Sequence, residues 1–95
     1  MTEKSFNNYK VVVRVKDIKG KCWFGYKVGD TFEFDGDEMK GRICLMALGD
    51  MFTNVALLMF GAEIPWAKGK DKIITQMCPD MSGQVLFEMR RVRKE

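Results

Sequence analysis

The sequence predicts a small α+β domain with the element order ββαββ. Apolar residues alternate with polar ones along four short segments, as is typical of strands, and recur every three to four residues along one longer segment, as is typical of an amphipathic helix. The chain has 95 residues, which is the length of one domain. The expected architecture is a small, mostly antiparallel sheet or partly closed barrel, packed on the helical segment.

The first two strands are expected at residues 10–18 and 31–35, with a glycine-rich loop at 20–29 between them. In each strand, every second residue is apolar, so one face of the strand turns toward the core. The residues expected on this face are Val11, Val13, Val15, Phe32 and Phe34.

The helical region is expected at residues 42–60, either as one helix or as two short helices broken near Gly49. One face of this helix is an apolar stripe, and three further apolar residues fall on the opposite, polar side. Apolar residues there indicate either a second covered surface or a break in the helix. The stripe consists of Cys44, Leu48, Met51, Val55 and Leu58, and the three others are Met46, Leu57 and Phe60.

The last two strands are expected at residues 72–78 and 84–92, joined as a hairpin by a turn at 79–83. In the final strand, the residues expected to face the core are Val85, Phe87 and Met89.

Residues 1–9 are expected to form a flexible leader, and residues 10–95 a single domain. The leader is polar, and no apolar run approaches the roughly 20 residues needed to cross a bilayer. We therefore expect a cytoplasmic protein with no membrane partner. The net charge of +3 is mild and, outside the basic tail at 90–94, nearly balanced, which disfavours nucleic acid as a partner.

The chain contains no histidine. This excludes Ser-His-Asp and Cys-His catalysis, and it removes the side chain that most often moves protons near neutral pH. The composition therefore favours a protein that binds over one that catalyses, although it leaves the question of an enzyme open. No cofactor is required by the sequence.

A thiol site is the main candidate for chemistry. The three cysteines, Cys22, Cys44 and Cys78, are an odd number without C-x-x-C spacing, which argues against a secreted disulfide framework. If the fold brings them together, with Asp80 or Glu63 as a fourth ligand, they would form a metal, iron–sulfur or redox site.

A binding surface is the other candidate. Aromatic residues with a polar tip are common in ligand and partner sites, and two loops carry them beside charged residues. The residues proposed for this surface are Trp23, Tyr26, Lys27, Glu63 and Trp66.

Four segments together resemble a family of short, uncharacterised proteins of about 90 residues, sometimes in tandem, found largely in anaerobic bacteria and archaea. These segments are residues 20–32, 42–48, 61–66 and 77–92. The family has no established activity, so the resemblance implies the extent of the domain and not a function. An anaerobic setting would imply reduced thiols.

The resemblance also implies that the cysteine positions of the family fall on Cys22, Cys44 and Cys78. Two positions depart from the pattern: Tyr26 stands where many relatives have His, and Leu45 where they have Pro. If that His had a role in the family, the departure weakens the case for the same role here.

Two functions are therefore expected from the sequence. The favoured one is a non-catalytic accessory or binding domain for a small molecule or a protein partner. The alternative is a thiol-based metal or redox site. The sequence leaves homo-oligomerisation open.

Overall fold

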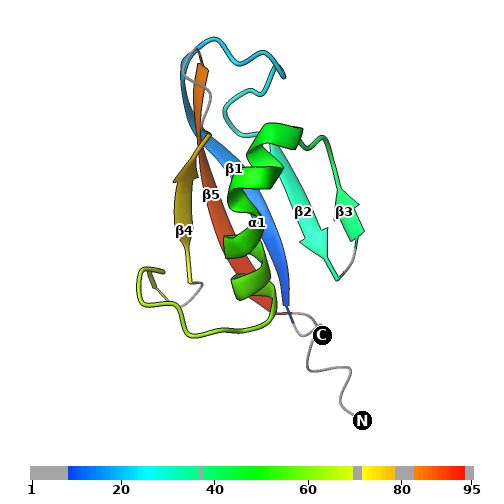
Figure 1. Ribbon diagram of the computed structural model, residues 1–95, viewed down its shortest axis with the longest axis vertical. Helices are drawn as coiled ribbons and strands as arrows, with labels where there is room; N and C mark the ends of the chain where they lie inside the picture. The colour runs from blue at the N-terminus through cyan, green and yellow to red at the C-terminus, as the bar shows by residue number, and fades with distance from the viewer. Residues whose placement is uncertain (1–8, 37, 70–71, 79–82, 94–95) are drawn as a thin grey trace.

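An open antiparallel sheet carries one helix on one of its faces (Figure 1). The computed structural model describes residues 9–36, 38–69, 72–78 and 83–93. Within them, the elements are β1 (Tyr9–Gly20), β2 (Thr31–Asp35), β3 (Glu38–Lys40), α1 (Leu45–Met59), β4 (Ile74–Met77) and β5 (Gly83–Arg93).

The order of the strands in the sheet is β3-β2-β1-β5-β4, and all neighbours are antiparallel. The two long strands, β1 and β5, form the centre and pair from Tyr9↔Arg93 to Gly20↔Gly83, with one irregularity between Val15 and Asp17. The edges are the short strands β3 and β4, which do not pair with each other. The sheet is therefore open, and the structure does not support a partly closed barrel.

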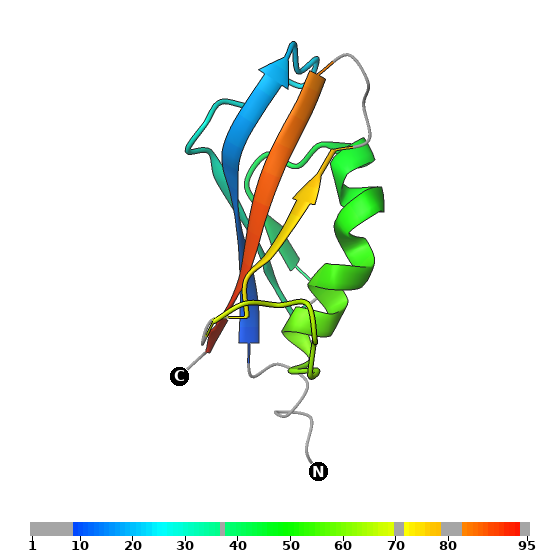
Figure 2. The same ribbon diagram turned by 90° about the vertical axis from the view of Figure 1, so that its left-hand side faces the viewer.

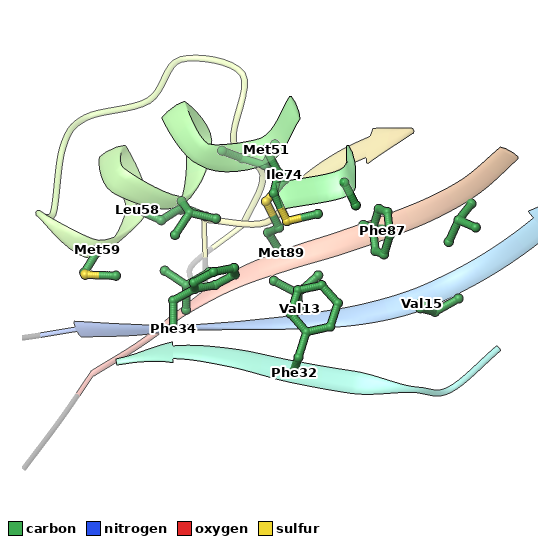
Figure 3. Close-up of a cluster of buried hydrophobic side chains, with 14 of the residues drawn as sticks. Val13, Val15, Phe32, Phe34, Met51, Leu58, Met59, Ile74, Phe87 and Met89 are labelled. Carbon is green, nitrogen blue, oxygen red and sulfur yellow. The ribbon is translucent and has the colours of Figure 1, made fainter. Parts of the chain in front are cut away.

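The core lies between the sheet and α1, which packs over β1 and β5 (Figure 2). Figure 3 shows aromatic and aliphatic side chains of the strands pointing toward Met51, Leu58 and Met59 of the helix. All eight strand residues expected to face inward are buried, as are Met51, Val55 and Leu58 of the predicted helical stripe. Cys44 and Leu48 of that stripe are half-buried.

The opposite face of the sheet is charged, and no helix of the described residues covers it (Figure 2). Ion pairs join neighbouring strands there: Lys10 Nζ lies 3.4 Å from Glu33 Oε1, and Lys16 Nζ lies 3.8 Å from Glu88 Oε2. These pairs are partly exposed, so each contributes between about 0 and 1 kcal/mol. The apolar face of the sheet, and not the charged one, holds the fold together.

The structure confirms the small α+β fold and its element order, and it adds detail. Within the region at 42–60, Leu45–Met59 forms one unbroken helix despite Gly49. The strand β3 was not expected, because its three residues are all exposed and show no apolar alternation. Tyr9, expected in the leader, is the first residue of β1. Among the described residues, no helix is both long and apolar enough to cross a membrane.

The end of α1 is fastened to the sheet by Arg91 of β5. Its Nε donates a 2.8 Å hydrogen bond to the carbonyl oxygen of Leu58, and its Nη2 donates a 2.8 Å hydrogen bond to the carbonyl oxygen of Ala62. A longer bond of 3.5 Å runs from Nη2 to Leu57. The last carbonyls of a helix have no partner within the helix, and a cation near them is favourable. The guanidinium also lies 4.8 Å from the ring of Tyr9.

Replacing Arg91 with methionine should therefore loosen the end of the helix. Arg91→Met keeps an apolar stem but removes the charged donor, so we expect the free energy of unfolding to fall by about 1.5–3 kcal/mol. Urea denaturation measures this change. Arg14→Met is the matched control, because Arg14 is exposed on the charged face of the same sheet; it should change stability by less than about 0.5 kcal/mol. Equal losses in the two variants would contradict the proposed role of Arg91.

Candidate functional site

Tyr26 packs in the core, and it also lines a hollow of about 190 Å³ together with Asp30, Thr31 and Arg42. It is only 6% exposed, and its ring contacts Phe24, Phe32 and Phe87 with centroid distances of 4.7, 5.9 and 5.5 Å. The expectation that Tyr26 contributes to an exposed surface is therefore wrong. A large ring between two inward-facing strand aromatics is covered by them on folding.

The hydroxyl of Tyr26 holds the start of α1. It accepts a 2.9 Å hydrogen bond from the backbone N–H of Cys44 and donates one of 3.1 Å to the carbonyl oxygen of Arg42. Cys44 is the N-cap of α1, and its own side chain makes no capping hydrogen bond. A phenol from the loop between β1 and β2 therefore fixes the residues that lead into the helix.

The environment of Tyr26 raises the pKa of its phenol above its ordinary value. The main cause is burial, which disfavours the charged phenolate. The hydrogen bond from the Cys44 N–H acts in the opposite direction, because it favours the phenolate, but its effect is smaller. The hydroxyl therefore stays protonated and can donate its hydrogen bond to the carbonyl oxygen of Arg42.

The two tryptophans do not share a surface. Trp23 is 73% exposed and Trp66 is 56% exposed. Trp23 lies in the loop between β1 and β2, and Trp66 lies in the segment that leads from α1 to β4; these segments lie at opposite ends of the sheet in both views (Figures 1 and 2). The single surface expected from the sequence is therefore not formed.

The charged residues expected beside the tryptophans are likewise apart. Lys27 and Glu63 are exposed on these two separate segments. The backbone N–H of Lys27 donates a 2.9 Å hydrogen bond to Asp30 Oδ2, which closes the turn before β2. Trp66 lines a hollow of about 580 Å³ on the charged side of the sheet, together with Lys16, Lys68 and Glu88.

No disulfide joins the three described cysteines, and each is half-buried at the border of the core. Cys44 leads into α1, and the backbone N–H of Cys78 pairs with the carbonyl of Val85 at 2.8 Å. Within residues 9–36, 38–69, 72–78 and 83–93, no three Cys, Asp or Glu side chains are grouped so that they could hold a metal ion. Asp80 lies outside the described residues. The arrangement of the described part gives no support to a metal or iron–sulfur centre.

A concave, mostly apolar surface lies between α1 and the hairpin of β2 and β3. This hollow, which we call the α1 groove, has a volume of about 340 Å³. It forms because β3 has only three residues and leaves one side of the helix without cover. Glu38 is the one charged residue among the described residues of its lining. The lining consists of Phe34, Gly36, Glu38, Met39, Leu48, Phe52, Val55, Ala56, Met59 and Phe60.

Five large apolar side chains of α1 and its neighbours are exposed, and three of them line the α1 groove. Phe52 is 62% exposed, Phe60 is 60% exposed and Met39 is 55% exposed. At the start of the helix, Leu45 and Met46 are 80% and 62% exposed. Isolated exposed apolar residues are ordinary, but several that line one hollow, as Met39, Phe52 and Phe60 do, are typical of a contact surface. We call the five exposed side chains together the apolar rim.

Sequence reasoning identified only part of this site. Met46 and Phe60 were recognised as apolar residues on the polar side of the helix, whereas Met39 and Phe52 were not singled out. One signal was present: residues 45–59 contain Asp50 as their only charged residue. A surface helix normally has a charged or polar face, so this composition indicates that more than one side of α1 needs cover.

Comparisons with protein-family models, with curated proteins and with solved structures found no match to this chain. The resemblance to a family from anaerobes therefore stays a prediction. The functional argument has to rest on the geometry of the chain itself.

The Tyr26 hydroxyl should contribute measurably to stability. Tyr26→Phe keeps the buried ring but leaves the Cys44 N–H and the Arg42 carbonyl without this partner, so we expect the free energy of unfolding to fall by about 1–3 kcal/mol. Tyr9→Phe is the control, because the Tyr9 hydroxyl meets only the exposed guanidinium of Arg93 in the described contacts; we expect it to change stability by less than about 0.5 kcal/mol. Equal effects in urea denaturation would contradict the assignment.

The raised pKa of Tyr26 also predicts how this contribution varies with pH. Below about pH 10, the phenol is protonated in both states and the stabilisation is complete. At higher pH, the unfolded chain loses the proton first, so the free energy of unfolding falls as pH rises toward the folded pKa. The stability difference between the native chain and Tyr26→Phe should therefore shrink above about pH 10. A difference that stays constant between about pH 8 and 11 would contradict this prediction.

Proposed function

We propose that this protein is a non-catalytic binding module that holds an apolar partner surface in the α1 groove. The observation that carries the proposal is the apolar rim, whose five side chains are each more than half exposed and of which Met39, Phe52 and Phe60 line a hollow of about 340 Å³. Burying apolar surface releases roughly 25 cal/mol per Å². Burying the exposed part of these side chains against a partner would therefore supply binding free energy.

The lining supports binding more than chemistry. General acid–base catalysis needs an ionisable acid and base positioned at the reacting atoms. Among the described residues that line the α1 groove, Glu38 alone carries an acid or base of this kind, and the chain has no histidine. An apolar hollow with a single polar border is instead the arrangement found where apolar side chains of a partner are held.

The floor of the groove is rigid enough to receive a partner without rearrangement. Phe34 and Val55 are buried at 4% and 2% exposure, and Met59 is 7% exposed. These residues pack in the core between sheet and helix (Figure 3). Because α1 is hydrogen-bonded at its start by Tyr26 and near its end by Arg91, the wall of the groove has a fixed position. A preformed site loses less entropy on binding than one that must be ordered.

The proposal predicts that an apolar probe binds at the α1 groove. In dilute protein, the fluorescence of 1-anilinonaphthalene-8-sulfonate should rise on addition of the native chain. Phe52→Glu places a charge at the rim and should weaken dye binding by about tenfold or more, because a carboxylate resists removal from water. Val28→Glu is the matched control, since Val28 is 59% exposed but lies in the loop between β1 and β2. It should bind dye as the native chain does.

Circular dichroism should show the same helix content in both variants, which separates a lost site from a lost fold. Dye binding that is equal in the native chain and in Phe52→Glu would contradict the proposed function.

A further inference from the structure

We infer that the partner held in the α1 groove is a second copy of this chain, packed through α1 in a two-fold symmetric dimer. The inference rests on the proposed function, because it names the occupant of the same surface. Three observations carry it. The surface has both a projecting side chain and a hollow, and its area approaches that of a dimer interface. The charged side chains of the central strands lie mainly on the other face of the sheet.

A two-fold interface must fit itself, because the same patch is contributed by both copies. The α1 surface meets this requirement. Phe52 stands out from the helix while also forming one wall of the groove, and Phe60 and Met39 flank the same hollow. When two copies face each other, the projecting ring of each one can enter the hollow beside the helix of the other. A groove without a neighbouring projection would favour an unrelated partner instead.

The exposed apolar area is close to what a stable dimer needs. A large apolar side chain has roughly 200 Å² of surface, so the apolar rim exposes on the order of 600 Å². This equals the upper end of the largest apolar patch of an ordinary monomer, about 300–600 Å². It is also about three quarters of the roughly 800 Å² that each partner buries in a stable interface. Polar groups at the border would supply the remaining area.

The charge distribution lets two identical chains approach at this face. Each copy carries a net charge of +3, and like charges repel. Lys10, Lys16 and Arg90 of the sheet lie on the face away from α1, and Arg91, which faces α1, is engaged by carbonyl oxygens at the end of the helix of its own chain. The one charged residue of α1, Asp50, is held within its own chain, because Gln76 Nε2 donates hydrogen bonds to its carboxylate at 2.8 Å and to its carbonyl at 2.7 Å.

The same distribution disfavours a membrane surface as the occupant. Helices that lie on a membrane usually carry lysine or arginine along their polar face, where these residues meet anionic lipids. The helix α1 contains neither, from Leu45 to Met59. An uncharged helix face is instead suited to another uncharged protein face.

Gly49 offers a test that separates the dimer from the fold. At about 100° per residue, Gly49 lies on the outer face of α1 between Leu45 and Phe52. A Cβ added there would meet nothing within 4 Å in its own chain, so a larger side chain fits the monomer. Leucine also favours a helix more than glycine does. Gly49→Leu should therefore raise the urea midpoint of the monomer, yet keep the two helices of a dimer apart.

The experiment is sedimentation equilibrium over a wide range of protein concentration. The native chain should approach twice its mass of 11.0 kDa as concentration rises. Phe52→Glu and Gly49→Leu should each raise the dissociation constant of the dimer by at least about 30-fold, the effect of losing a central contact. Val28→Glu should leave it within about twofold, as a surface substitution outside the interface. In the native chain, the dye signal per molecule should also fall as the dimer forms.

Each other outcome overturns the inference. A native chain that stays monomeric at every concentration would contradict the dimer. If the dye still binds this monomer and fails to bind Phe52→Glu, the proposed binding function survives, and only the identity of the partner is wrong. A dimer that neither Phe52→Glu nor Gly49→Leu weakens lies at another surface. A monomer that sediments with phosphatidylglycerol vesicles, and loses this property in Phe52→Glu, has a membrane as its partner.

Discussion

The helix α1 is held against the sheet by polar contacts near its two ends, and the rest of the structure depends on this fastening. At the start, the Tyr26 hydroxyl accepts a hydrogen bond from the backbone N–H of Cys44. Near the end, Arg91 donates hydrogen bonds to the carbonyl oxygens of Leu58 and Ala62. Each contact satisfies backbone groups that helix geometry leaves without a partner. Apolar burial between helix and sheet supplies most of the stabilisation, but it does not by itself specify where along the sheet the helix lies. The polar contacts supply that position.

A fixed helix on a sheet with one short edge produces the α1 groove. The strand β3 ends after three residues, so the sheet is too narrow on this side to cover α1. The helix in turn has little polar surface with which to face water, since Asp50 is its one charged residue and Gln76 engages it. The exposure of Phe52 and Met39 follows from both facts together. A longer edge strand or a charged outer helix face would have closed or masked the groove, so we regard this surface as the functional feature of the fold.

The sequence predicted the core well and the site poorly, for a physical reason. Alternation in β1, β2 and β5 reports which residues face inward, and burial of Val13, Phe32 and Phe87 confirmed it. No comparable periodic pattern in the sequence reports which residues of a loop, or at the border of a helical stripe, are exposed. Tyr26 was expected at a surface because it lies in a loop of glycines and lysines, yet the ring packs between core aromatics. Phe52 lies at the border of the apolar stripe, where only the width of the sheet decides whether it is covered.

The central claim is that two copies of the chain meet through the surface around the α1 groove, while the other exposed apolar residues stay outside this contact. Methyl NMR of methionine-labelled protein tests it in one dilution series, because the chain carries methionine reporters both at and away from the groove. Met39 and Met46 belong to the apolar rim, whereas Met77 is 41% exposed on β4. The account predicts that the methyl signals of Met39 and Met46 shift with protein concentration while that of Met77 stays fixed. Signals of Met39 and Met46 that do not move, or that move no more than the signal of Met77, would contradict it.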